Sequence, residues 1–183
     1  MTGHHLILGE ITDILTGEIL EDTHDERYRQ KLARLLIHNK GYTASEVIPR
    51  NELIVRAGEK QAVIRVDLIV NLSEKIGMII RYGPGSLVTR HRPALAMSRL
   101  VSSYRVPVAV VTNGEDVDVL NALSGKLMGT GFDAIPHRAR LKDIMAESDF
   151  SPVSKKQAEM ESRIVYCYEI DGSCPCDTTI CTL

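Results

Sequence analysis

The chain has 183 residues, of which 44% are hydrophobic and 25% are charged, and its formal net charge at pH 7 is -2. This length and composition are typical of one compact globular domain and exclude collagen, coiled coil and wholesale disorder. No uncharged apolar run approaches the roughly 18 residues of a membrane-spanning helix, and residues 1–10 lack the features of a signal peptide. We therefore expect a cytoplasmic protein that does not interact with membranes.

The first half of the chain predicts a helix followed by a hairpin. Thr23 is a favourable N-cap, with Glu26 three residues later, and apolar residues then recur at helical spacing until Gly41. Residues 52–56 and 62–72 are rich in apolar and β-branched residues and flank a turn. We expect these two strands to pair as an antiparallel hairpin.

The next part predicts a strand, a crossover helix and a second strand. Residues 78–80 form a short apolar run, and Pro93 is expected at the first position of the helix. Residues 106–112 are a continuous β-branched run, typical of an interior strand buried on both faces. Because crossover connections join parallel strands, we expect these two strands to be parallel.

Two further elements complete the predicted architecture. The runs 117–122 and 126–129 predict a peripheral hairpin, and a last helix is expected to start near Ser151. The expected fold class is α/β, a mixed β-sheet flanked by helices. We divide the chain into an α/β domain over residues 1–150 and a C-terminal helix with a cysteine-rich tail over residues 151–183.

Arginines are concentrated in one segment of the chain. Residues 76–114 contain five arginines and no Asp, Glu or Lys, whereas residues 9–27 are rich in acids. A guanidinium group holds phosphate through a planar fork of donors, so Arg90, Arg92 and Arg99 are predicted to bind nucleic acid. The alternatives are a solvated charged face, or salt bridges between the arginines and the acidic N-terminal segment.

Asp67 is the most informative residue of the sequence. It lies inside an apolar strand, where an unpaired carboxylate is expensive to bury. A salt bridge to Arg65 or to another arginine would compensate it, and so would a divalent cation used in phosphate chemistry. Glu26, in the first turn of the preceding helix, is a second acid that helix packing could bring near Asp67.

An ordered set of segments now suggests a family. The segments are the acid-rich residues 13–18, the helix that ends at residues 40–42, the strand 66–70, and a strand that closes with Thr112-Asn113-Gly114. Over about residues 9–129, the sequence resembles the N-terminal domain of type I restriction enzyme R subunits, a branch of the PD-(D/E)XK nuclease superfamily. This resemblance implies a restriction-endonuclease-like fold, which would make the first of our two domains a nuclease-like domain.

The resemblance also implies a metal site. In this superfamily a helix acid, a strand Asp and a Glu-x-Lys on the following strand share magnesium, and Glu26 and Asp67 match the first two. The third element departs from the pattern, because the following strand has isoleucines where the Glu is expected and Arg81 or Tyr82 where the Lys is expected. Arginine does not lose its proton in proteins, so Arg81 cannot act as a base.

Two outcomes are open for the catalytic positions Glu26, Asp67 and Arg81. If Arg81 pairs with Asp67, the fold has kept its core while the metal has been replaced, and catalysis is lost or altered. If Glu46 or Glu52 supplies the missing ligand, Mg²⁺ binds at Asp67 and the chain is an active nuclease.

The four cysteines of the chain all lie at its C-terminal end: Cys167, Cys174, Cys176 and Cys181. Clustered cysteines in a cytosolic protein are more often metal ligands or reactive thiols than disulfides. Soft thiolate ligands select Zn²⁺ or an iron–sulfur centre, and the tail is similar in placement to cysteines that hold an iron–sulfur cluster in some nucleases of the superfamily. We predict a metal site here; free thiols and a disulfide are the alternatives.

The leading hypothesis for function is a stand-alone relative of the restriction-subunit N-terminal domain. It would bind nucleic acid, DNA in preference to RNA, with lost or altered nuclease catalysis. The alternatives are an active Mg²⁺-dependent DNA nuclease and a structural or assembly protein.

Overall fold

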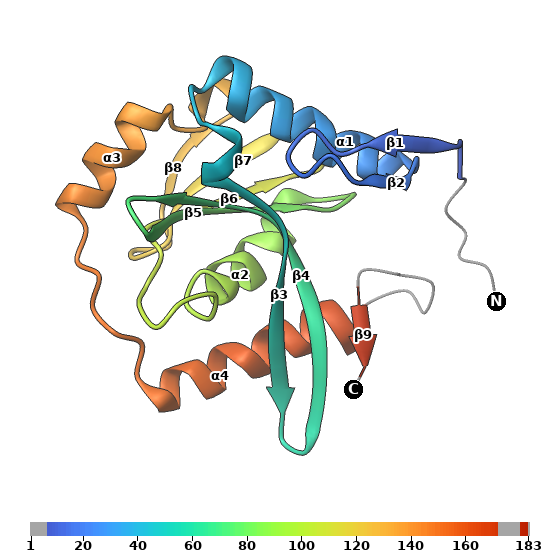
Figure 1. Ribbon diagram of the computed structural model, residues 1–183. Helices are drawn as coiled ribbons and strands as arrows, with labels where there is room; N and C mark the ends of the chain where they lie inside the picture. Colours follow the sequence, from blue (N-terminus) through green and yellow to red (C-terminus); the bar gives the residue numbers. More distant parts are fainter. Residues whose placement is uncertain (1–6, 172–179, 183) are drawn as a thin grey trace.

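The computed structural model describes residues 7–171 and 180–182 of the chain. A mixed sheet lies at its centre (Figure 1), built from β3 (Val47–Ala57), β4 (Lys60–Leu72), β5 (Lys75–Tyr82), β6 (Val108–Thr112), β7 (Val117–Asn121) and β8 (Leu127–Thr130). These strands follow one another in space in chain order, and β9 (Ile180–Thr182) pairs with β4. All neighbours are antiparallel except β5 and β6, which are parallel as predicted.

Helices cover both faces of the sheet. The α-helices of the described part are α1 (His24–Arg34), α2 (Leu87–Met97), α3 (Arg138–Glu147) and α4 (Lys155–Tyr166). Leu32 of α1 and Leu141 of α3 belong to one hydrophobic core, and Met97 of α2 and Val165 of α4 belong to a second. In Figure 1, α1 and α3 accordingly lie on one side of the sheet and α2 and α4 on the other. The expected α/β architecture, with a mixed sheet flanked by helices, is confirmed.

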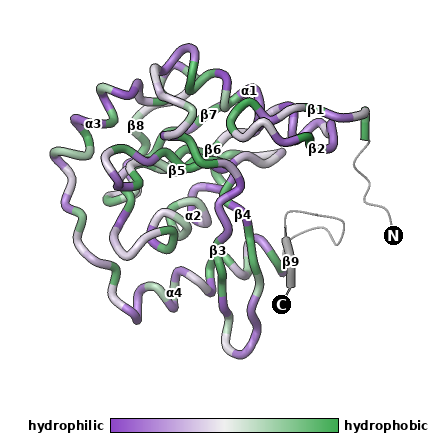
Figure 2. The backbone as a smooth tube through the Cα atoms, viewed as in Figure 1, coloured by the Kyte–Doolittle hydropathy of each residue, from purple (hydrophilic) through white to green (hydrophobic). Residues whose placement is uncertain are grey.

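Strand β6 illustrates why the sheet has two cores. All five of its residues are buried, and Figure 2 shows this strand as hydrophobic along its length. Val108 and Val110 face the first core, while Ala109 faces the second. The β-branched run thus forms an interior strand buried on both faces, as its sequence predicts.

The N-terminal helix also forms as expected. The side chain of Thr23 caps α1 by accepting a hydrogen bond from the backbone N–H of Glu26 over 3.1 Å. The helix continues as the π-helical turn η1 (Leu35–Asn39), and Gly41 follows with φ +76°, a conformation that favours glycine.

One predicted helix start is wrong. Pro93 lies inside α2, which begins at Leu87, rather than at its first position. No glycine or proline interrupts the six residues before Pro93, so they extend the helix in the N-terminal direction. Pro93 removes one backbone N–H donor from the helix interior, and it is buried together with residues 94–97.

Several short elements were not predicted. They are β1 (Glu10–Thr12) and β2 (Ile19–Glu21), which form a separate hairpin, the 3-10 turns η2 (Ala44–Glu46) and η3 (Phe132–Ala134), and the π-helical turn η4 (Cys167–Asp171). The sequence also did not predict helix α3. Both predicted hairpins, β3–β4 and β7–β8, are confirmed. The strands of the first hairpin are longer than expected. Pro49 fits in β3 because β3 is an edge strand.

The C-terminal helix packs on the sheet domain. Helix α4 contacts β3 and α2, and its residues Val165 and Tyr166 belong to the same core as Met97. The division of the chain at residue 150 stays a prediction. Among the residues described, no helix has the length and apolar character needed to cross a bilayer.

Candidate functional site

Two arginines converge on the carboxylate of Asp67, in the middle of the sheet. Arg29 of α1 donates from Nε to Oδ1 over 2.7 Å, and Arg81 of β5 donates from Nη1 to Oδ2 over 2.7 Å. The backbone N–H of Tyr82 also donates to Oδ2, over 2.8 Å. Asp67 is only 3% exposed, and each of its two oxygens accepts a hydrogen bond from an arginine.

Electrostatics keep this cluster charged. Burial raises the pKa of the Asp67 carboxyl, but the positive charges of Arg81 and Arg29 lower it by more, so that the pKa lies below its usual value. Burial likewise lowers the pKa of Arg81, while the charges of Asp67 and Glu169 raise it above its usual value. Asp67 is therefore an ionised carboxylate at neutral pH, and its lone pairs point at guanidinium groups.

Glu26 reaches the same cluster through Arg29. Its carboxylate accepts a hydrogen bond from Gln30 Nε2 over 2.9 Å and lies 3.6 Å from Arg29 Nη1. Arg81 extends the cluster on the other side, because its Nη2 donates to Glu169 of η4 over 2.8 Å. We call Glu26, Arg29, Asp67, Arg81 and Glu169 the sheet cluster; the structure brings the three predicted catalytic positions together in it.

Tyr82 and Gly114 show how the loops beside the sheet cluster are built. The ring of Tyr82 stacks on that of Tyr28 with 5.3 Å between centroids, and the guanidinium of Arg29 lies 5.9 Å from the Tyr82 ring centroid. A Cβ added at Gly114 would lie 2.6 Å from the Tyr28 ring, and Gly114 has φ +95°. The Thr-Asn-Gly sequence at the end of β6 thus requires glycine at its third position for two reasons, backbone conformation and contact with α1.

Comparison with protein families decides the relationship. Residues 24–136 match the N terminus of type I restriction enzyme R proteins, and this match spans more than half of the chain and every element of the sheet cluster except η4. The chain belongs to this family. A comparison with curated proteins finds no match, and neither does a comparison with solved structures.

Within this restriction-subunit family member, the residues around Asp67 do not fit a magnesium ion. A carboxylate that binds Mg²⁺ must direct lone pairs at the ion, whereas the two oxygens of Asp67 accept from two guanidinium groups and a backbone N–H. The described residues also contain no group of three or more His, Cys, Asp or Glu that could hold a metal ion. We derive no catalytic step through a metal at this site.

Glu46 and Glu52, the candidates for a displaced third ligand, each have an arginine partner. Arg138 donates to Glu46 from Nη2 over 2.6 Å and from Nε over 2.9 Å, and this contact lowers the pKa of Glu46 to about 2. Glu52 lies 3.4 Å from Nη2 of Arg65 across the hairpin. Each of the two carboxylates therefore has a partner of its own in this family member.

The predicted nucleic-acid-binding arginines do not share one open face. Arg92 and Arg99 both bind Glu161 of α4, each with a nitrogen–oxygen distance of 2.6 Å. We call Arg92, Arg99 and Glu161 the helix cluster, because it joins α2 to α4. Arg90 instead turns to the loop after β5, where it donates to the carbonyl oxygen of Pro84 over 2.8 Å.

The acid that pairs with Arg92 and Arg99 comes from the C-terminal segment, and not from the acidic N-terminal segment. In that segment, Asp22 pairs with Arg27 over 2.6 Å, and Asp13 pairs with Arg50 over 2.6 Å. Arg50 has the unusual φ of +51° and forms no ladder pair with Asp67 opposite it, although the β3–β4 register is the same on both sides. Its ion pair with Asp13 ties the β1–β2 hairpin to the sheet.

The predicted cysteine site lies mostly outside the described residues. Cys174 and Cys176 fall outside them, and Cys181 lies in β9, of which only the backbone is described. Cys167 begins η4, and its thiol is free and exposed. A Zn²⁺ or iron–sulfur site at these four cysteines stays a prediction.

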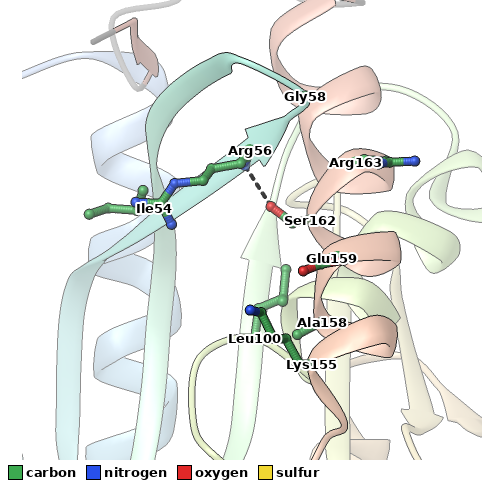
Figure 3. A pocket seen from close by; sticks show the side chains of 9 residues that line it. All are labelled: Ile54, Arg56, Gly58, Leu100, Lys155, Ala158, Glu159, Ser162 and Arg163. Atoms are coloured by element: carbon green, nitrogen blue, oxygen red, sulfur yellow. Dashed lines mark hydrogen bonds between the residues drawn. The ribbon is translucent and has the colours of Figure 1, made fainter.

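Two cavities of the described part have arginines in their lining. A cavity of about 600 Å³ between β3 and α4 is lined by Arg56, Lys155 and Arg163 among others. Figure 3 shows the side chains of Arg56 and Arg163 pointing in opposite directions, so their charges do not converge on a ligand. A smaller cavity, of about 60 Å³, lies beside the sheet cluster and is lined by three arginines: Arg29, Arg81 and Arg90.

Sequence reasoning missed three residues of these clusters: Arg29, Glu161 and Glu169. Arg29 had a usable signal, because it follows Glu26 by three residues and therefore lies on the same face of the helix. Glu161 and Glu169 had none, since they lie 62 and 88 residues from the arginines they bind.

Proposed function

We propose that this chain is a nuclease-fold domain that binds DNA without cutting it. The observation that carries the proposal is the position of Arg81, whose guanidinium lies 2.7 Å from Asp67. In the nuclease superfamily this neighbourhood holds a metal ion between carboxylates. Here a fixed organic cation takes its place.

This replacement keeps a positive charge beside Asp67 but changes the chemistry. A guanidinium neutralises the buried carboxylate and can hold a phosphate oxygen through its N–H donors. It has no site for a water molecule to be activated, and it cannot accept a proton at physiological pH. The expected result is a site that attracts a phosphodiester and leaves it intact.

Membership of the restriction-subunit family supports DNA as the ligand. Further support comes from Arg90, which lines the small cavity beside Arg81. Its hydrogen bond to the Pro84 carbonyl uses one of its five donors, which leaves the others for a phosphate group. Arg92 and Arg99 contribute less in this proposal, because Glu161 already offsets part of their charge.

A cleavage assay tests the catalytic part of the proposal. The full chain, incubated with duplex or single-stranded DNA and Mg²⁺ or Mn²⁺, is expected to leave both substrates intact. Metal-dependent cleavage that is abolished in Asp67→Asn would overturn this part and establish the active nuclease instead.

A binding isotherm at several salt concentrations tests the DNA-binding part. Each phosphate contact contributes roughly one unit to the slope of log affinity against log salt. Arg90→Ala is expected to reduce the slope by about one unit, whereas Arg140→Ala, an exposed arginine of α3, is expected to leave it unchanged. Binding that is absent or indifferent to salt would favour the structural or assembly protein.

A further inference from the structure

Glu169 is the one member of the sheet cluster that comes from outside the region matched to the family. It lies in η4, directly after α4, and its carboxylate accepts from Arg81 Nη2 over 2.8 Å. The side chain of Glu169 is 11% exposed. The C-terminal segment therefore places the carboxylate of Glu169 against the guanidinium of Arg81, which belongs to the sheet.

The two carboxylates that contact Arg81 are held very differently. Asp67 accepts three hydrogen bonds, from two arginines and one backbone N–H, and it lies in the middle of a strand. Among the residues that the structure describes, the carboxylate of Glu169 accepts one hydrogen bond, and it lies on a single turn of helix. Of the two, Glu169 is the carboxylate that a competing anion can displace.

The cavity beside this contact has the size and donors of an oxyanion site. Its lining includes three arginines, Arg29, Arg81 and Arg90, and two acids, Asp25 and Glu169. Asp25 accepts a hydrogen bond from the Tyr82 hydroxyl. The volume of about 60 Å³ has room for a few water molecules or one small oxyanion. Gly83 allows Arg90 to approach, since a Cβ at that position would lie 2.5 Å from the guanidinium carbon of Arg90.

We propose that Arg81 and Arg90 form a phosphate-binding subsite, and that Glu169 covers it by occupying the place of a phosphate oxygen on Arg81. This inference deepens the proposed function and rests on it for the nature of the ligand. The guanidinium fork suits a phosphate group, and the source of that group is either free phosphate, the phosphorylated end of a DNA strand, or an internal phosphodiester. Binding at the subsite requires that Glu169 move away from Arg81.

The experiment measures inorganic phosphate binding to the full chain at constant ionic strength. The side-chain Nε–H resonances of the arginines are followed by NMR, and Arg90 is assigned by its loss in Arg90→Gln. Glu169→Gln removes the competing charge, and it is expected to bind phosphate about tenfold more tightly than the wild-type chain. The double variant Glu169→Gln/Arg90→Gln is expected to lose this gain.

Glu159→Gln provides the matched control, because Glu159 is an exposed glutamate of α4, the helix that directly precedes η4. It is expected to bind phosphate as the wild-type chain does. Equal phosphate affinity in Glu169→Gln and wild type would overturn the proposal. So would a gain in Glu169→Gln that the double variant retains, since Arg90 would then have no part in the subsite.

DNA binding by the same variants separates the sources of the phosphate. A preference of Glu169→Gln for an oligonucleotide with a 5′-phosphate over one without it identifies a strand end, and equal enhancement for both identifies internal phosphodiesters. Phosphate binding without any DNA binding would support the subsite and overturn the proposed function. DNA binding with no response to Glu169→Gln in either assay would support the proposed function and overturn the subsite.

Discussion

Two clusters of arginines and carboxylates join the C-terminal segment to the sheet domain, and they differ in how completely their polar groups are satisfied. In the sheet cluster, Asp67 is surrounded by donors and Arg81 is only 10% exposed. In the helix cluster, Arg92 is 41% exposed. Moreover, Nη1 of Arg92 and Nε of Arg99 are buried without a hydrogen-bond partner among the described atoms.

This difference shows what each cluster contributes. A buried charge that is fully paired cannot lose one partner without leaving another charge stranded, so the sheet cluster should tolerate substitution poorly. The helix cluster lies between two helices, where water can reach Arg92 and replace a lost partner in part. The same residue types thus form an interior network in one place and a helix contact in the other.

The largest effect is expected from removing the centre of the sheet cluster. Asp67→Ala leaves the guanidinium groups of Arg29 and Arg81 facing each other without their shared carboxylate. We expect a loss of about 3–5 kcal/mol in the free energy of unfolding, measured by urea denaturation monitored by circular dichroism.

Glu52→Ala is the control for this substitution, because it removes a carboxylate from an exposed pair with Arg65 in the same hairpin. Its expected cost is about 0–1 kcal/mol. If the two substitutions lowered the free energy of unfolding by similar amounts, Asp67 would stabilise the fold no more than an exposed carboxylate does.

A smaller effect is expected in the helix cluster. Glu161→Ala removes the carboxylate shared by Arg92 and Arg99, and we expect a loss of about 1–3 kcal/mol in the free energy of unfolding. Glu159→Ala, a solvent-exposed substitution in the same helix, should change stability by less than about 0.5 kcal/mol. If Glu161→Ala cost as much as Asp67→Ala, exposure of Arg92 would not be the feature that distinguishes the clusters.

Another arginine–carboxylate pair, Glu46 with Arg138, extends the comparison to the pH dependence of stability. Hydrogen bonds from Arg138 lower the pKa of Glu46 from an ordinary value of 4.5 to about 2. Because the folded-state pKa is the lower one, this pair stabilises the protein fully above the unfolded-state pKa, and the stabilisation is lost as pH falls from 4.5 towards 2.

The measurement is the free energy of unfolding as a function of pH for the wild-type chain and Glu46→Gln. The difference between the two is expected to shrink across that acidic range. A difference that stays constant with pH would show that Glu46 titrates normally in the folded protein.

The smallest effect is expected at Arg90. Arg90 donates a hydrogen bond to the loop carbonyl of Pro84, and among the described residues it forms no ion pair with a carboxylate. Arg90→Ala should therefore change the free energy of unfolding by less than about 0.5 kcal/mol, measured by the same denaturation. A larger loss would show that Arg90 stabilises the loop, and it would then be a poor probe of phosphate binding.

The sequence by itself determined the framework of this protein. Local signals are sufficient for the Thr23 cap, the hairpin strands and the interior strand β6, because capping groups and residue periodicity act over a few positions. The need to compensate Asp67 was also visible, since burying a carboxylate in an apolar strand is costly whatever the fold. The family followed from the order of these segments and is confirmed by the match over residues 24–136.

Only the tertiary structure decided what compensates Asp67 and what neutralises the arginine-rich segment. Arg81 was one of several arginines that could have paired with Asp67, and Arg29 joined it because α1 packs beside β4. Glu161 and Glu169 reach their partners only after α4 has docked on the sheet, 62 and 88 residues away in sequence. Ion pairs between distant segments leave no periodicity in the chain, because the Coulomb interaction depends on distance in space and not on separation along the sequence.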